Sequence, residues 1–444
     1  MVRWRCELLV FTLLLAGFAL RPAPSHAESP LDSISSPVRR PAPEQATWVG
    51  KIPIIHVGIA PQVAAVELSS SGAWRIGVVG KRRNAEEITA GGTWRFTADG
   101  TRLRVKDHMG STRDAGDDTL FAYPAPQSGT PMRVNGQPYR GEMLVFAAGG
   151  GAITVVNVVD MESYLRGVVP SEIGRAGPDR IEAVKAQAVA ARSYTLAHLD
   201  RWRPQGFDLF ATAADQVYKG VKGEREDVDA ALRATCGVVA VHEGEPIQAF
   251  YSSTCGGITA EPDEVWGRPP QTYLKARRDS ARRTGEPFCA QSPFYRWTEH
   301  WSGTELERIL KETLPSVIGA RNPEAWGPLT DLRLRDRSRS RRVERLEIVF
   351  AKETFSVGGD QIRWILRRPG GDGLRSALLL SLDVDRARGR VKNVRISGAG
   401  FGHGVGLCQF GALGMARDGY DYREILHFYY KGIHLVRAYD RWPG

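Results

Sequence analysis

The chain has 444 residues, of which 42% are hydrophobic and 25% are charged, and its formal net charge at pH 7 is +10. A chain of this length can form about two or three domains with their own hydrophobic cores. The basic excess suits polyanionic material, an anionic membrane surface or nucleic acid, and charge alone does not choose between them. Beyond residue 20 no stretch has the length and apolarity of a membrane helix, which argues against later membrane spans.

The N-terminus has the pattern of an export signal. Two arginines precede an apolar run from Leu8 to Leu20, and a small-x-small motif ends at Ala27. The run is shorter than a bilayer span, so we predict a signal peptide over residues 1–27, with an uncleaved anchor as the alternative. The protein is then expected in the periplasm, the cell wall or the extracellular space. Residues 28–48 are rich in proline and serine and are predicted to be a linker.

Four cysteines follow the predicted signal peptide: Cys236, Cys255, Cys289 and Cys408. An oxidising compartment permits disulfides, and we favour a bond between Cys255 and Cys289. The other connectivities stay open at this point.

Residues 49–148 are predicted to form a small N-terminal β domain. Short β-type runs such as IPIIHVGIA, AAVELSS and WRIGVVG recur, and Asn135-Gly136 is a hairpin signal ahead of EMLVFAA. No cluster of chemically capable residues occurs here, so packing or contact with the cell wall is its expected role.

The stretch that follows joins one carboxylate to an alanine-rich helix. Asp160 is suited to cap a short helix that Pro170 is expected to end, which leaves Glu172 in a loop. A second helix should begin near Pro178 and run to about Asp200. Apolar residues at steps of three and four predict one buried stripe on it. The stripe comprises Ile181, Val184, Ala188, Ala191 and Thr195, and the polar residues Lys185, Gln187, Arg192 and Tyr194 fall on other sides.

The rest of the chain alternates hairpins with a glycine-rich block. VVAVH and PIQAFYSSTCGG predict a hairpin that ends in a hydroxyl-rich loop containing Ser253. Residues 296–395 are predicted to be an inserted module. It should contain a helix capped by Ser302, two strands around an arginine-rich turn with a solvated tip, and further β structure at QIRWILRR. The last block carries His403 and Gln409 among alternating glycines, which indicate tight turns or close approach.

We therefore predict an α+β fold: a mixed, β-rich domain with a central alanine-rich helix, plus the small N-terminal β domain. Residues 149–295 and 396–435 should form the core that carries the function.

Motifs in that core resemble, in order, those of the SpoIID/LytB family of cell-wall proteins. They are VVPSEIG, EAVKAQAVAARSY, DQVYKG, AFYSSTCGG with EVWG, and GAGFGHGVGLCQFGALGMA with HFYYKGI. Members of the family include lytic transglycosylases of peptidoglycan and proteins described as amidase enhancers.

The resemblance implies a set of site residues. The family's catalytic glutamate falls on Glu172. The resemblance also implies that Cys255 and the expected substrate-binding residues lie around one cleft with Glu172. The substrate-binding residues are Lys185, Gln187, Arg192, Tyr194, Ser253, His403 and Gln409. A zinc-binding member carries histidine and cysteines where this chain has Phe207 to Tyr218, a segment without either. No HxxxH or CxxC spacing supports zinc elsewhere, so we predict no metal and no cofactor.

The chemistry agrees with a single acid. Glycosidic cleavage needs a proton on the leaving oxygen, and Val168, Val169 and Pro170 give Glu172 an apolar setting that should raise its pKa. In a lytic transglycosylase, as the resemblance implies, the muramyl 6-hydroxyl attacks and leaves an anhydro-muramyl end, so one glutamate suffices. A hydrolase would need a second carboxylate, for which Asp215, Glu261 and Asp263 are candidates.

We predict a lytic transglycosylase that cleaves glycan strands between MurNAc and GlcNAc. The alternative is a non-catalytic peptidoglycan-binding amidase enhancer. A third hypothesis is a metal-dependent wall hydrolase using His403 with Cys408 or Cys255. The expected partners are glycan strands and a cell-wall amidase, without nucleic acid. Arg192 or Lys185 would hold the lactyl carboxylate, but cations lower the pKa of a nearby glutamate, so we expect them some way from Glu172.

Overall fold

The structure is a computed structural model that describes residues 51–174, 177–281, 284–440 and 442. The signal peptide predicted over 1–27 and the linker predicted over 28–48 lie outside the described residues. The predicted α+β class is confirmed, because helices and several separate sheets occur together. No helix in the described part is both long and apolar enough to cross a membrane.

Two β-sheets, built mostly from residues 54–160, share one hydrophobic cluster that includes Trp74, Trp94 and Phe96. The predicted hairpin at Asn135-Gly136 is confirmed, and both residues have the positive φ that such a turn requires. One sheet has the order β13 (Leu209–Phe210), β1 (Ile54–Val63), β12 (Ala152–Asp160), β11 (Glu142–Gly149), β8 (Leu120–Pro124), β3 (Trp74–Val78) and β4 (Glu86–Ile88). The other has the order β10 (Gln137–Tyr139), β9 (Met132–Val134), β2 (Ala65–Ser70), β5 (Trp94–Asp99), β6 (Arg102–Lys106) and β7 (Thr112–Gly116).

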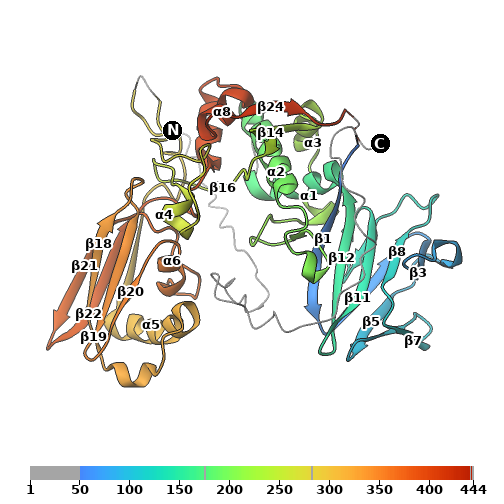
Figure 1. Ribbon diagram of the computed structural model, residues 1–444, viewed down its shortest axis with the longest axis horizontal. Helices are drawn as coiled ribbons and strands as arrows, with labels where there is room; N and C mark the ends of the chain where they lie inside the picture. Colours follow the sequence, from blue (N-terminus) through green and yellow to red (C-terminus); the bar gives the residue numbers. More distant parts are fainter. Residues whose placement is uncertain (1–50, 175–176, 282–283, 441, 443–444) are drawn as a thin grey trace, which may run out of the picture.

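Helices form the centre of the molecule, with two small sheets beside them (Figure 1). The helices are α1 (Met161–Ile173), α2 (Ile181–Ala197), α3 (Glu226–Ala234), α4 (Pro262–Trp266), α7 (Gln409–Arg417) and α8 (Tyr422–Tyr429). One sheet has the order β15 (Glu245–Pro246), β14 (Val238–His242) and β24 (His434–Arg437), which includes the predicted hairpin. In the other, β16 (Tyr251–Ser252) pairs in parallel with β23 (Leu407–Cys408), so the hydroxyl-rich loop and the glycine-rich block lie side by side.

Helix α2 is buried on almost every side. Its first turn is the 3₁₀ turn Pro178–Arg180, as the proline predicted, and the α-helix ends at Ala197 rather than near Asp200. The prediction of a single buried stripe was wrong, because α1, α3, α7, α8 and β14 all pack around the helix. The alanines make such close packing feasible, and even Gln187 and Arg192 are fully buried.

Helix α1 continues past Pro170, contrary to the prediction that this proline ends it. Proline removes one backbone donor, and that loss is local. The bond lost at Pro170 is the one to the carbonyl of Arg166, and the next carbonyl, that of Gly167, accepts from the Ser171 hydroxyl at 3.2 Å and from the N–H of Lys219 at 3.2 Å. The helix therefore reaches Ile173, and Glu172 sits in its last turn instead of a loop.

Residues 297–398 have a hydrophobic cluster of their own. Ser302 caps α5 (Gly303–Ile318), as predicted, by accepting from the N–H of Glu305. QIRWILRR was predicted to be β structure, but it forms the short helix α6 (Gln361–Ile365), which buries Ile362 and Ile365 at a helical spacing. The two sheets here have the orders β17 (Trp297–Ser302), β22 (Arg390–Gly398), β21 (Leu379–Ala387), and β18 (Leu329–Arg337), β19 (Val343–Phe350), β20 (Thr354–Val357).

The arginine-rich turn between β18 and β19 is a solvated tip only in part: Arg337, Arg339 and Arg341 are exposed, whereas Arg342 is not. Arg339 forms an ion pair with Asp263 at 2.6 Å. Arg342 is buried and donates to the carbonyls of Cys255 and Ile258, each at 3.3 Å. The turn also fastens residues 297–398 to the central core.

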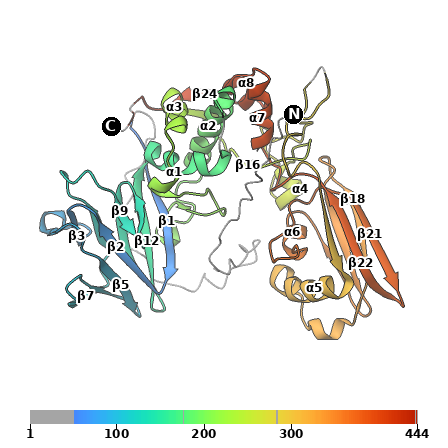
Figure 2. The same ribbon diagram turned by 180° about the vertical axis from the view of Figure 1, so that it is seen from behind.

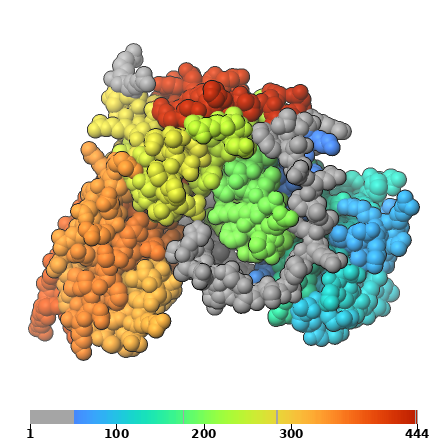
Figure 3. All heavy atoms as spheres, in the orientation of Figure 1, coloured from blue at the N-terminus to red at the C-terminus, as the bar shows by residue number. Residues whose placement is uncertain are grey.

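The two β-rich parts lie on opposite sides of the helical centre (Figures 1 and 2). In the space-filling view, the residues of the centre coloured green separate the N-terminal sheets from the part that contains α5 (Figure 3). A broad cleft is lined by residues from all three regions, including Gly149, Glu172 and Trp364.

Candidate active site

Glu172 lines this cleft from the last turn of α1. The backbone N–H of Val217 donates a 2.7 Å hydrogen bond to its Oε1 atom. The Gln409 side chain also hydrogen-bonds to the carboxylate. Segments far apart in the sequence thus hold one carboxyl group at the cleft surface.

Burial raises the pKa of Glu172 to about 7. The hydrogen bonds from Val217 and Gln409 and the charge of Lys219 act in the opposite direction, but they do not cancel the effect of burial. The residue is only partly buried, with some surface left open. A carboxyl group with a pKa near 7 is protonated in roughly half of the molecules at neutral pH, which suits both proton donation and proton acceptance.

Polar groups in the wall of the site form a connected network. The Tyr251 hydroxyl donates to Gln216 Oε1 at 2.8 Å, and Gln216 Nε2 donates to Thr195 Oγ1 at 2.8 Å and to the Tyr164 hydroxyl at 3.3 Å. Burial raises the pKa of Tyr164 and of Tyr251, and the charge of Glu172 adds to both shifts. Both rings therefore lie near Glu172. The network stiffens the wall that carries the acid.

Five of the predicted site residues line the same cleft: Glu172, Tyr194, Ser253, His403 and Gln409. The Tyr194 hydroxyl donates to Asp215 Oδ1 at 3.2 Å, and its ring stacks on His198 at a centroid distance of 4.0 Å. The backbone carbonyl of Ser253 accepts from the N–H of Phe410 at 3.0 Å, which joins the loop after β16 to the start of α7. Gln187 lies behind this surface, fully buried, and its Oε1 accepts from Gln409 Nε2 at 3.4 Å.

Arg192 does not face the cleft, so the prediction that it binds substrate is contradicted. Its guanidinium makes two 2.9 Å hydrogen bonds to Glu162 and one of 3.0 Å to the carbonyl of Val238, and both charged side chains are fully buried. The Tyr439 hydroxyl donates to the same carboxylate at 2.6 Å. Arg192 therefore ties α2 to α1, β14 and the C-terminal segment.

Lys185 is likewise not among the residues that line the cleft. Its Nζ atom pairs with Glu182 Oε1 at 2.6 Å on the same helix. The other oxygen of Glu182 accepts from the N–H of Tyr422 at 3.0 Å, so this pair belongs to the contact between α2 and α8. The structure thus places Lys185 away from the cleft lining, and its predicted substrate contact stays a prediction.

Both nitrogens of His403 are occupied by backbone groups. Nδ1 accepts from the N–H of Val405 at 3.0 Å, and the ring also hydrogen-bonds to the backbone of Tyr251. Burial lowers the pKa of His403 to about 4, so the ring is neutral at neutral pH. These contacts give His403 a role in fixing the glycine-rich block against β16.

Two of the candidate second carboxylates are already held by several donors. Asp215 accepts from Tyr194, Arg201, Trp202 and the N–H of Phe210. Those four donors fill the acceptor sites of a carboxylate. Glu261 is similarly held by Lys275, Arg339 and the N–H of Ala276. Asp263 pairs with Arg339 through one oxygen, while its other oxygen has no hydrogen-bond partner among the described residues.

The favoured disulfide is absent: Cys255 and Cys289 are both free thiols, with their sulfur atoms 3.7 Å apart. A disulfide requires about 2.05 Å. Cys408 and Asp279 lie in the same buried group.

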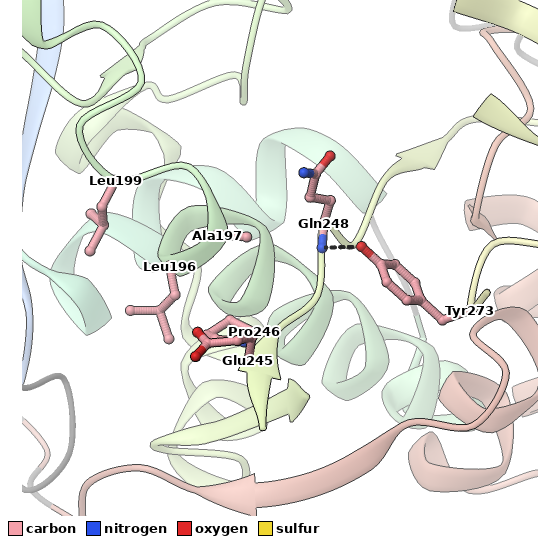
Figure 4. A pocket seen from close by; sticks show the side chains of 7 residues that line it. All are labelled: Leu196, Ala197, Leu199, Glu245, Pro246, Gln248 and Tyr273. Carbon is pink, nitrogen blue, oxygen red and sulfur yellow. Dashed lines mark hydrogen bonds between the residues drawn. The ribbon is translucent and has the colours of Figure 1, made fainter. Parts of the chain in front are cut away.

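A second, smaller pocket lies between the end of α2 and β15 (Figure 4). Across it the Tyr273 hydroxyl accepts from the backbone N–H of Gln248 at 3.2 Å. Its only carboxylate is Glu245, which is exposed. The cleft at Glu172 is therefore the better candidate for the active site.

Three contributors to the site were not singled out from the sequence: the backbone of Val217 and the side chains of Gln216 and Tyr251. All three lie inside motifs that carried the family resemblance, DQVYKG and AFYSSTCGG. Those motifs were the available signal, but a backbone donor and a hydrogen-bond chain have no residue pattern of their own.

Comparisons with known proteins agree with the motifs. The family model for Stage II sporulation protein, SpoIID, matches residues 149–242, and a model for a domain of unknown function matches residues 284–406.

An uncharacterized protein of Brachyspira hyodysenteriae is 32% identical over 310 residues, which cover 68% of this chain and 73% of that protein. The Stage II sporulation protein D of Bacillus subtilis is 26% identical over 301 residues, covering 64% of this chain and 76% of that protein. The amidase enhancer of the same organism is 27% identical over 314 residues, covering 61% of this chain and 40% of that protein. With its motifs in this order and these relatives, the chain belongs to the SpoIID/LytB family.

Proposed function

We propose that this protein is an exported lytic transglycosylase that cleaves the glycan strands of peptidoglycan between MurNAc and GlcNAc. The observation that carries the proposal is Glu172, a partly buried carboxyl group in the cleft whose pKa is raised to about 7. The family membership supports the choice of a cell-wall substrate.

In the proposed reaction Glu172 acts first as an acid and then as a base. Its proton passes to the bridging oxygen as the bond from that oxygen to the muramyl anomeric carbon breaks, which frees the GlcNAc hydroxyl. The muramyl 6-hydroxyl then bonds to the same carbon and returns its proton to Glu172. No water is consumed, and the product is an anhydro-muramyl end. A pKa near 7 serves both proton transfers without a large energetic penalty on either.

The state of the neighbouring carboxylates favours this route over hydrolysis. A hydrolase needs a second carboxylate to activate water or to attack the sugar. Asp215 already accepts hydrogen bonds at each of its lone-pair sites, and Glu261 is held by two cations. Asp215 and Glu261 are thus already engaged, whereas Asp263 lines the cleft and keeps one oxygen without a hydrogen-bond partner among the described residues.

The metal-dependent alternative loses support from the geometry of His403. Both ring nitrogens are engaged by backbone groups. In the described part of the chain, the cluster that includes Cys255 and Cys408 does not include this histidine.

A non-catalytic role in which the protein binds peptidoglycan and stimulates a wall amidase remains the alternative. Its support is the likeness to a protein named amidase enhancer. Under this alternative the cleft would bind glycan, and Glu172 would be a binding residue.

The test is incubation of the purified protein with glycan strands, with and without stem peptides, followed by mass analysis. We expect anhydro-muramyl ends that disappear with Glu172→Gln and persist with the matched control Glu226→Gln, which alters an exposed glutamate on α3. If no bond is cleaved by the wild type, but a partner amidase is accelerated, the amidase-enhancer function is correct. Cleavage that yields ends without the anhydro-muramyl sugar, and that a chelator abolishes and zinc restores, would instead favour metal-dependent hydrolysis.

A further inference from the structure

Four buried side chains converge behind the cleft: Cys255, Asp279, Cys289 and Cys408. All four are fully excluded from solvent, and their ligand atoms lie within 4.8 Å of one another. They come from three separate segments: Cys255 from the loop after β16, Asp279 and Cys289 from the connection between α4 and β17, and Cys408 as the residue that caps α7. The lack of a CxxC motif is why sequence spacing did not reveal the cluster.

The distances suit a tetrahedral metal ion. Zinc binds thiolate sulfur at about 2.3 Å, so two sulfurs on one zinc lie roughly 3.8 Å apart. Cys255 and Cys289 are separated by 3.7 Å. Cys255 Sγ is also 3.1 Å from Asp279 Oδ2, so a carboxylate oxygen faces the sulfurs.

Surrounding groups already hold these atoms in the orientation of metal ligands. Cys408 Sγ accepts from the backbone N–H groups of Cys255 at 3.2 Å and Gly411 at 3.3 Å, as a thiolate at a helix N-terminus does. The Tyr429 hydroxyl donates to Asp279 Oδ1 at 2.7 Å and leaves Oδ2 directed at the sulfurs. Partners of this kind orient the ligands in most protein metal sites.

A disulfide between Cys255 and Cys289 would not explain why the carboxyl group of Asp279 is buried beside them. Among the described residues no lysine, arginine or histidine forms an ion pair with it, although the carboxyl group is fully buried. The guanidinium of Arg342, on the other side of Cys255, donates to backbone carbonyls instead. An uncompensated buried charge is costly, and a divalent cation bound by the thiolates would compensate it.

We propose that Cys255, Asp279, Cys289 and Cys408 bind one Zn²⁺ ion as a structural site. Four protein ligands fill a tetrahedral shell, so the ion has no open position for substrate or water. Its function is to clamp the start of α7 to the loop after β16. Cys408 directly precedes Gln409, the residue that hydrogen-bonds to Glu172, so the clamp fixes one partner of the acid. Binding displaces the thiol protons and does not involve oxidation.

The test is metal analysis of the purified full chain, prepared without added reductant or chelator. We expect about one zinc per chain, and after replacement by Co²⁺ a sulfur-to-cobalt charge-transfer absorption. Asp279→Asn, Cys289→Ser and Cys408→Ser should lose most of the zinc, while Cys236→Ser, a buried thiol outside the cluster, should keep it. Tyr429→Phe preserves the ligands and should weaken zinc binding by about 10–100-fold.

Two results would overturn the proposal. One is wild-type protein without zinc that also fails to take up Co²⁺. The other is a peptide mass map, after alkylation and digestion without reductant, that shows Cys255 joined to Cys289. Because zinc content is measured without substrate, neither result depends on whether the protein cleaves glycan. If the cysteine variants do not fold, Tyr429→Phe and the wild-type metal content still decide the question.

Discussion

Replacing Glu172 with glutamine should abolish the reaction and stabilise the protein at alkaline pH. The pKa of Glu172 is raised from 4.5 to about 7, and each unit is worth about 1.4 kcal/mol. Because the native state holds its proton more tightly than the unfolded state, wild-type stability is complete below pH 4.5 and falls as the pH rises to about 7. The full loss is about 3 kcal/mol, which is an upper limit because part of the side chain is open to water.

Glutamine mimics the protonated carboxyl group and does not titrate, so Glu172→Gln avoids that loss. We expect the variant and the wild type to have similar stability near pH 4, and the variant to be more stable by up to about 3 kcal/mol at pH 8. Urea unfolding at a series of pH values measures the difference directly. In the glycan assay the same variant should lose roughly 10²–10⁴-fold in rate, the usual contribution of a general acid or base.

The reasoning would be refuted by parallel stability curves for the two proteins across this pH range. Such curves would mean that burial does not perturb the acid. If Glu172→Gln gains alkaline stability but still forms anhydro-muramyl ends, the raised pKa of Glu172 is supported and its catalytic role is contradicted. Glu226→Gln should change neither property, because that side chain is exposed.

Three further substitutions test the surroundings of the acid. Gln409→Ala removes a hydrogen bond that lowers the pKa of Glu172, so the alkaline limb of kcat/KM should move to higher pH; an unchanged pH profile would contradict the bond. Arg192→Met leaves Glu162 as a buried, unpaired charge and should cost about 3–5 kcal/mol in urea unfolding, whereas Arg192→Met with Glu162→Leu should recover most of it. Lys185→Ala should change stability by less than about 1 kcal/mol and kcat/KM by less than about twofold, and a selective rise in KM would restore its predicted role in binding.

Local patterns in the sequence were sufficient for most secondary structure. The Asn135-Gly136 turn, the cap at Ser302 and the proline at the start of α2 each act through their own backbone, so they could be predicted from a few neighbouring residues. The failures occurred where tertiary contacts decide. Beside Pro170, the carbonyl of Gly167 accepts a hydrogen bond from the N–H of Lys219, which lies far along the chain.

Several residues of the site could be predicted from the sequence, but which of them line the cleft and which are buried in the core could not. Motif order identified Glu172, Tyr194, Ser253 and Gln409, all of which line the cleft. It could not distinguish a polar residue on a cleft-facing side of α2 from one on a core-facing side, because other elements surround the whole helix. Arg192 was misassigned for this reason, since its partner Glu162 comes from α1 and gives no signal at a helical spacing.

The positions of Arg192 and Lys185 also explain how Glu172 can be an acid at neutral pH. An apolar setting raises the pKa of a carboxyl group, and cations near it would lower that pKa again. The charge of Arg192 is compensated by Glu162 in the core, and that of Lys185 by Glu182 on the face of α2 that meets α8. Among the described residues, Lys219 is the only cation that contributes to lowering the pKa of Glu172, and its effect is smaller than those of burial and the two hydrogen bonds. The helix can therefore carry basic residues without returning its neighbouring acid to an ordinary pKa.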